Sequence, residues 1–212
     1  MIAAILNNWD QYRDSDCENT KTWKAHVLEW LHKYGNVFSK NKSERMLIQK
    51  LYDHVIDFVE DTMLPKPAKV YLLSLAERNS LDTWIDEKLR KGYIQPSTSP
   101  IAAPFFFVKK YNGSLWPIMG YRALNEITIK NCYPIPRIAD LIESLSKASI
   151  FTKIDLRWGY NNACIKEENE WKTAFITRQG LFEATVIYFG FFNVPMTFQS
   201  MMNDILGDLI CI

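Results

Sequence analysis

The feature that most constrains the fold is a change in the spacing of apolar residues near residue 103. Residues 103–110 and 114–120 have the composition of strands, and they flank Asn112-Gly113, a strong signal for a tight hairpin turn. Before this point, apolar residues recur at the spacing typical of helices. The sequence therefore predicts an α+β chain, in which helices are combined with hairpins rather than with regular βαβ units.

The first half of the chain carries two helix signals. Residues 21–34 place an aromatic stripe at helical spacing, and Gly35 is a typical residue after a helix end. Ser74 and Glu77 form a capping box, which predicts a helix that begins there and ends at Gly92. The residues between these two helices contain two prolines and no clear period, which predicts a connector.

The second half carries two more helices and two more strands. Pro134 and Pro136 precede a helix whose apolar residues are predicted to face the core, namely Ile138, Leu141, Ile142 and Leu145. Pro195 lies where a helix can begin, and a buried stripe is predicted to follow it, made of Phe198, Met201, Met202, Ile205 and Leu209. Strands are predicted at residues 173–177 and 181–188, around a turn at Gln179-Gly180.

Asp155 ends an apolar, β-branched run that begins at residue 148. A carboxylate at the tip of a buried strand is well placed to hold Mg²⁺. A two-metal centre needs at least one further acidic side chain nearby. None of the later acidic residues forms a plausible pair on a second strand, and these are Glu167, Glu168, Glu170, Glu183, Asp204 and Asp208. The sequence, which ends at Ile212, therefore predicts only half of such a centre.

The net charge of +1 conceals an uneven distribution. Residues 1–87 carry a net charge of −3, residues 88–178 carry +7, and residues 179–212 carry −3. A basic middle segment is compatible with contact to nucleic acid, and equally with an unevenly solvated surface. Charge alone leaves both interpretations open.

Several classes of protein are disfavoured by what the sequence lacks. It contains no P-loop, GxGxxG, GxSxG or HExxH motif. Its four cysteines show no CxxC spacing, which predicts free thiols, and its three histidines are predicted to pack or to lie on the surface. No apolar run approaches the roughly 20 residues that span a bilayer, and the N-terminus is a poor signal peptide. We therefore expect no membrane association and a cytoplasmic or nuclear rather than a secreted protein.

The remaining motifs form one ordered series. Taken together, they resemble the reverse transcriptase of gypsy-type long-terminal-repeat retrotransposons, and residues 157–162 resemble fungal members of that group. The segments that carry the resemblance are residues 93–100, 107–115, 121–125, 131–136, 148–160, 170–175, 180–183 and 189–204. It covers roughly residues 70–212. Residues 1–69 are predicted to be a separate helical segment and connector, in which 30–57 resemble the link between protease and polymerase.

The resemblance implies the fingers and part of the palm of a right-hand polymerase. It implies RNA-directed DNA polymerase activity, that is, template-directed nucleotidyl transfer with Mg²⁺ as cofactor. The partners would be an RNA or DNA template-primer and a dNTP, with the oligomeric state left open. Asp155 would be the catalytic, metal-binding aspartate, with the carbonyl of Leu156 beside it.

The resemblance also implies two groups of binding residues. The nucleotide-binding group is Lys109, Tyr160, Phe189 and Gly190, although core packing remains an alternative role for the two aromatic residues. The template-binding group is Arg122, Asn125 and Gln199. Lys109 would place positive charge at the nucleotide phosphates, where phosphoryl transfer develops negative charge.

The chain departs from the family pattern at four places. The Tyr-x-Asp-Asp motif that supplies the other metal-binding aspartates would follow the last residues of this sequence. Gly120, Trp116 and Met196 stand where the family usually has Asp, a phosphate-binding Arg and Ala. We therefore expect residues 1–212 to be inactive as an isolated polymerase. The alternative function is that of a non-enzymatic remnant that binds nucleic acid or a partner protein.

Overall fold

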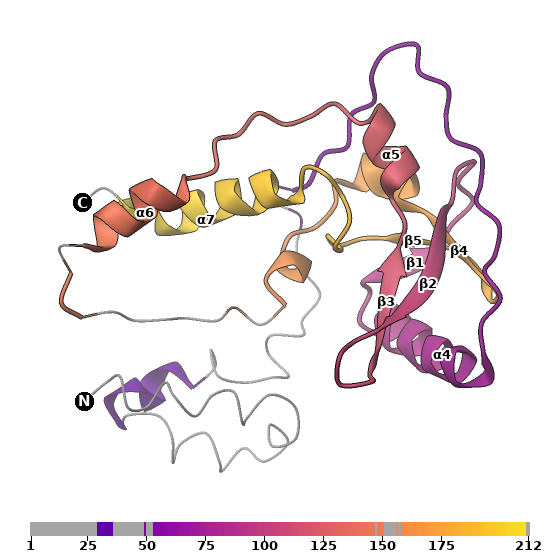
Figure 1. Cartoon of the computed structure of the whole chain (residues 1–212), viewed down its shortest axis with the longest axis horizontal. Helices are drawn as coiled ribbons and strands as arrows, with labels where there is room; N and C mark the ends of the chain where they lie inside the picture. The colour runs from indigo at the N-terminus through magenta and orange to yellow at the C-terminus, as the bar shows by residue number, and fades with distance from the viewer. Residues whose placement is uncertain are drawn as a thin grey trace. The chain divides into compact units, whose positions relative to one another are not determined.

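The structure is a computed structural model that describes residues 29–35, 49, 53–146, 148–150, 156 and 158–210 (Figure 1). The chain divides into two compact units, each made of two segments. One unit is Met1–Arg45 with Pro136–Arg157, and the other is Met46–Ile135 with Trp158–Ile212. The second unit contains the β-sheet and most of the predicted site residues.

The sheet has five strands in the order β1-β5-β4-β2-β3. The strands are β1 (Ile94–Pro96), β2 (Ala103–Lys109), β3 (Leu115–Met119), β4 (Phe175–Thr177) and β5 (Gly180–Ala184). All neighbours are antiparallel except β2 and β4, which are parallel. The fold is mixed α+β with hairpins, as the sequence predicts.

The β2–β3 hairpin confirms the turn signal at Asn112-Gly113. Gly113 has φ +79°, a left-handed conformation that glycine adopts without strain. The Lys110 amide donates to the Ser114 carbonyl at 2.8 Å, which closes the loop, and the Asn112 side-chain oxygen accepts from the Ser114 amide at 3.1 Å. The second predicted hairpin also forms, but its strands are shorter than expected and Thr177 pairs with Gly180. Its turn residues are therefore Arg178 and Gln179, one position earlier than predicted.

Helix α4 (Leu75–Arg90) begins at the predicted capping box. The Glu77 amide donates to the Ser74 hydroxyl, and the Ser74 amide donates to the Glu77 carboxylate at 2.8 Å. The helix packs on the sheet through Trp84, whose ring lies 5.4 Å from that of Phe105 and 6.1 Å from that of Phe175. The chain reverses after the helix at Gly92, which has φ +68°.

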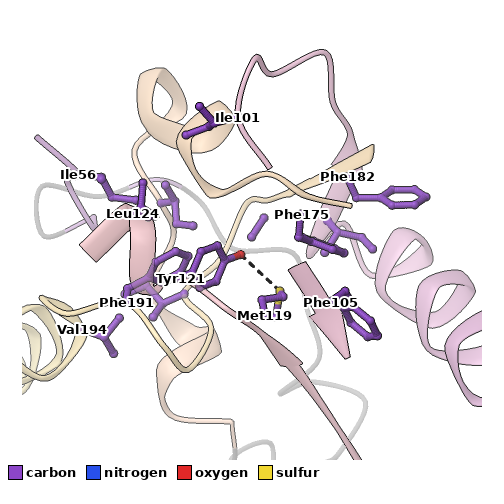
Figure 2. Close-up of a cluster of buried hydrophobic side chains, with 14 of the residues drawn as sticks. Ile56, Ile101, Phe105, Met119, Tyr121, Leu124, Phe175, Phe182, Phe191 and Val194 are labelled. Atoms are coloured by element: carbon purple, nitrogen blue, oxygen red, sulfur yellow. Dashed lines mark hydrogen bonds between the residues drawn. The ribbon is translucent and has the colours of Figure 1, made fainter. Parts of the chain in front are cut away.

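The core lies between α4, the sheet and the segments that follow β3 and β5. Figure 2 shows Tyr121 and Phe191 packed side by side in it, with Phe105 and Phe175 nearer to the sheet. The rings of Tyr121 and Phe191 stack with centroids 4.1 Å apart. The Tyr121 hydroxyl donates to the Thr173 carbonyl at 2.8 Å, so this buried polar group is satisfied.

Among the described residues, three α-helices follow the hairpin: α5 (Arg122–Ile127), α6 (Ile138–Leu145) and α7 (Val194–Ile210). Helix α6 begins where predicted, but its apolar residues do not face a core. Ile138 is 76% exposed and Ile142 is 64% exposed, so the prediction of core positions was wrong for this helix. Helix α7 buries Met201 and partly buries Phe198 and Met202, whereas Ile205 is exposed, so Ile205 does not join the predicted buried stripe.

Residues 53–69 belong to the same unit as the sheet. The His54 ring is buried, with Nδ1 at 2.8 Å from the Thr197 hydroxyl and the ring 5.7 Å from that of Phe191. Burial lowers the pKa of His54 to about 4, so the ring is neutral near pH 7 and packs as predicted. The predicted division of the chain at residues 69 and 70 stays a prediction.

Of the residues 21–34 predicted as a helix, the structure describes a 3₁₀ helix, η2 (Glu29–Tyr34). Cys132 and Cys164 are free thiols, as predicted. Within the described part of the chain, no helix is both long and apolar enough to cross a membrane.

Candidate functional site

Asp155, the predicted catalytic residue, lies outside the described residues, as do most of the residues of its predicted strand. Leu156 is described and exposed. Among the residues that the structure describes, no three acidic, histidine or cysteine side chains lie close enough together to hold a metal ion. The described side chains therefore do not fit a metal centre by themselves, and Mg²⁺ at Asp155 stays a prediction.

The structure brings the two predicted aromatic residues of the nucleotide site together. Tyr160 begins the 3₁₀ helix η3 (Tyr160–Asn162), and its ring meets that of Phe189 edge to face at 4.9 Å. The other neighbour of Tyr160 is Phe198 of α7, also edge to face at 5.0 Å. Phe189 is 61% exposed. The pair is thus anchored on one side by α7 and open to solvent on the other.

Trp116 extends this aromatic surface onto the hairpin. Its ring lies 6.3 Å from that of Phe189. The Lys110 ammonium lies 3.7 Å from the centre of the Trp116 ring, a close cation–π contact. Trp116 stands where the resemblance predicts an arginine, and the Lys110 ammonium lies against the face of its ring.

The strand register places the two hairpin lysines on opposite faces. Trp116 pairs with Val108, and Lys109 pairs with Leu115. Because successive strand residues alternate between faces, Lys109 shares a face with buried Phe105, whereas Lys110 follows on the face of Trp116. The hydrogen bonds from Ser74 lower the pKa of Glu77 at the start of α4, and the charge of Lys109 lowers it further. Lys110 is thus the hairpin lysine that contacts the aromatic surface.

The segment that carries Tyr160 is attached to α4 by a contact that the sequence did not suggest. Trp158 has φ +53°, a conformation rare for a large side chain. Its ring lies 4.7 Å from the Lys88 ammonium, and Lys88 is almost fully buried beside Glu87. Helix period alone could have placed Lys88 on the buried face of α4, but nothing in the sequence pairs it with Trp158.

Gly190 occupies a position that only glycine fills without strain. Its φ is +118°, and an added Cβ would lie 3.3 Å from the Met119 carbonyl oxygen and 3.3 Å from the Tyr121 ring. The Gly190 carbonyl accepts a hydrogen bond of 2.7 Å from the Asn125 side chain. This hydrogen bond joins Gly190, a predicted nucleotide-binding residue, to Asn125, a predicted template-binding residue.

The template-binding residues have different environments. Asn125 uses both ends of its amide within the protein, because its oxygen also accepts from the Phe192 amide at 2.9 Å. Gln199 donates to Asn203 on the next turn of α7 at 2.8 Å. Arg122 is exposed and lines an open depression in the surface. Of the three, only Arg122 makes no side-chain hydrogen bond or ion pair with the described residues.

Chemically, the described site is an aromatic surface with cations beside it. Lys110 and Arg122 form no ion pair with a carboxylate among the described residues. Exposed rings offer stacking area, and ammonium and guanidinium groups bind phosphate. Such a surface can bind a nucleotide or a nucleic-acid strand.

The sheet and its helices define a polymerase fold. The native protease–reverse transcriptase of prototype foamy virus superposes with a TM-score of 0.74 at 22% identity, over 95% of this chain and 27% of that one. Residues 108–211 match the family described as reverse transcriptase (RNA-dependent DNA polymerase). The chain belongs to the reverse transcriptase family.

More particularly, the chain is similar to retrotransposon polyproteins. It is 32% identical over 208 residues to the retrovirus-related Pol polyprotein from transposon 297 of Drosophila melanogaster, which covers 96% of this chain. It is 37% identical over 155 residues, or 71% of this chain, to that from transposon opus. The Tf2-3 polyprotein of Schizosaccharomyces pombe is 28% identical over 86% of this chain. The chain spans only 19%, 16% and 15% of these three relatives.

Proposed function

We propose that this chain is the template-binding and nucleotide-binding part of a gypsy-type retrotransposon polymerase, whose bound strands are an RNA or DNA template and its primer. The observation that carries the proposal is the convergence of Tyr160, Phe189 and Trp116 beside Lys110. Foamy virus protease–reverse transcriptase, which shares the fold, has been solved in complex with an RNA/DNA hybrid and with double-stranded DNA.

In this proposal the side chains divide the recognition of a nucleotide between them. Tyr160 and Phe189 present their rings to the sugar and base, and Gly190 lets the chain approach closely because it has no Cβ. Lys110 and Lys109 place positive charge on the two faces of the hairpin, where phosphate groups pass. Asp155 and the Leu156 carbonyl remain the proposed ligands of a divalent metal ion.

Binding to a labelled RNA–DNA template-primer tests the proposal. The 212-residue chain should shift the anisotropy of the labelled duplex, with an affinity that falls as salt rises, because lysine and arginine release counterions from phosphates. The double variant Lys110→Gln/Arg122→Gln should reduce the salt slope by about two. Lys66→Gln, an exposed lysine of the connector, is the matched control. Absence of salt-dependent binding at low ionic strength would contradict the proposal.

Primer extension on the same duplex tests catalysis. The expectation that residues 1–212 alone do not extend a primer stays a prediction. Extension in Mg²⁺ or Mn²⁺ that is lost in Asp155→Ala would show that it is wrong.

A second function, binding of nucleic acid without catalysis, is favoured by one specific observation. The cation–π pairs Lys110–Trp116 and Lys130–Phe192 can hold a strand without a metal ion. Template-primer affinity that is unchanged in excess EDTA would favour this function, whereas affinity that requires Mg²⁺ would favour the first.

A further inference from the structure

An exposed ring and a cation lie together at a depression outside the Tyr160–Phe189 pair. Phe192 is 42% exposed, and the Lys130 ammonium lies 5.2 Å from the centre of its ring. Neither residue belongs to the predicted site. The depression is open to solvent and is lined by Arg122, Asn125, Glu126, Lys130, Gly190 and Phe192.

Asn125 fixes the backbone on which Phe192 is carried. Its side-chain nitrogen donates to the Gly190 carbonyl at 2.7 Å, and its oxygen accepts from the Phe192 amide at 2.9 Å. The Asn125 side-chain amide therefore both donates a hydrogen bond to the segment Gly190–Phe192 and accepts one from it. Since each end of the Asn125 amide makes a hydrogen bond to the main chain of this turn, the residue is suited to position Phe192.

Asn193 does the same for the loop that carries Lys130. Its side-chain oxygen accepts from the Asn131 amide at 2.9 Å, and its nitrogen donates to the Ile129 carbonyl at 2.8 Å. These two contacts flank Lys130 on both sides. Asn193 is buried, whereas the loop residues that it contacts are exposed. Two asparagine side chains thus hold the main chain that carries Lys130 and Phe192.

The charge at the depression suits a phosphate. Arg122 and Lys130 form no ion pair with a carboxylate within the described residues, while Glu126 is the only acidic side chain in the lining. The lining is therefore positive by one charge. An exposed aromatic ring beside cations is the combination by which proteins bind single strands, because every base has a face that can stack.

We propose that Phe192 is a stacking platform for one unpaired base of a DNA or RNA strand. Arg122 and Lys130 contact the phosphates on either side of that base, and Asn125 and Asn193 are positioning residues. The inference rests on the proposed nucleic-acid binding and adds the residues that would hold the unpaired strand. It also changes the role of Asn125 from a template contact to a support for Phe192.

Single-strand affinity tests the role of Phe192. A short fluorescein-labelled oligothymidylate is titrated with the full chain and with Phe192→Ala, Phe192→Leu and Phe192→Trp. Stacking predicts that alanine and leucine both weaken binding about tenfold, whereas tryptophan preserves it. Tyr71→Leu, which removes another exposed ring, should bind as the unaltered chain does. Thermal melts show that each variant is folded.

Leucine is the decisive substitution, because it keeps apolar bulk and removes only the aromatic face. Binding by Phe192→Leu equal to that of the unaltered chain would overturn the inference. If Lys110→Gln/Arg122→Gln still weakened template-primer binding in that case, the proposed function would stand without it. Absence of binding by the unaltered chain to either probe would instead reject the proposed function.

The positioning roles are tested by coupling. Asn125→Ala should weaken oligothymidylate binding in the unaltered background and have no further effect in Phe192→Ala, because its only route to the base is through Phe192. A purely structural role would weaken binding equally in both backgrounds and would overturn this assignment. Glu126→Gln should tighten binding, since it removes the one negative charge from the lining.

Discussion

Two groups of aromatic residues in this molecule have similar ring geometry and different surroundings. In the sheet core, Trp84 and Phe105 meet at 5.4 Å, and Phe175 beside them is fully buried. On the site surface, Tyr160 and Phe189 meet at 4.9 Å, but Phe189 is largely exposed. Ring contacts alone therefore do not separate a packing role from a binding role. The difference lies in exposure: Phe175 is enclosed by other rings, whereas Phe189 contacts rings on one side and is open to solvent on the other.

Phe175→Ala should have the largest effect on stability. Its ring contacts those of Trp84, Phe105 and Phe182, and its removal leaves a cavity among them. The free energy of unfolding should fall by about 3–5 kcal/mol, as measured by urea denaturation. Phe175→Leu should lose clearly less, because it keeps much of the volume. A loss below about 1 kcal/mol for the alanine variant, a size typical of surface changes, would show that the two groups do not differ in packing.

Gly190→Ala should have the next largest effect. Strain at φ +118° and the close approach to the Met119 carbonyl should lower the free energy of unfolding by about 1–3 kcal/mol. Gly207→Ala in α7 is the matched control, because nothing lies within 4 Å of an added Cβ there. That variant should gain about 0.5–1 kcal/mol from helix propensity. Equal effects of the two changes would mean that the turn at Gly190 is not constrained.

The parts of the fold that local rules govern could be predicted from the sequence. The β2–β3 hairpin and the start of α4 follow from Asn112-Gly113 and from the Ser74–Glu77 box, because each signal acts over a few residues. Helical period also predicted the existence of α6, but not its exposed apolar residues, since period does not say what a helix packs against.

The site could be predicted only as a set of residue types in order. Tyr160 and Phe189 were predicted to act together, and they do lie in contact. The hydrogen bond between Asn125 and Gly190 joins residues 65 positions apart, and no local sequence pattern predicts it. The separation of Lys109 from Lys110 depends on strand register, which the hairpin signal did not specify.

Glu170 should make the free energy of unfolding depend on pH. Burial, with smaller contributions from the charges of Glu183 and Glu167, raises the pKa of Glu170 to about 7 from an ordinary value of 4.5. Gln95 donates to both Glu170 and Glu183, at 2.9 and 2.8 Å, which holds the two carboxyl groups together. The folded chain therefore binds a proton that the unfolded chain releases more readily.

This shift fixes the sign of the pH effect. Below about pH 4.5 Glu170 is protonated in both the folded and the unfolded state, so it does not change the free energy of unfolding. Between pH 4.5 and 7 Glu170 ionises in the unfolded state but keeps its proton in the folded state, and this ionisation favours unfolding. Stability should fall as pH rises through this window and stay lower above it. Glu170→Gln should flatten the fall, as measured by the melting temperature across pH, whereas Glu168→Gln, an exposed neighbour, should not. An unchanged profile in Glu170→Gln would assign the effect to other groups.

Phe189→Leu should have the smallest effect on stability and so gives the sharpest contrast with Phe175. The ring is largely exposed and its neighbours Tyr160 and Trp116 can stay in place, so the free energy of unfolding should change by less than about 0.5 kcal/mol. Binding of template-primer should nevertheless weaken, because leucine has no face for stacking. Urea denaturation and anisotropy on the same preparation separate the two quantities. A large loss of stability with unchanged affinity would place Phe189 with the core rings, and the contrast between the two groups would then be one of exposure alone.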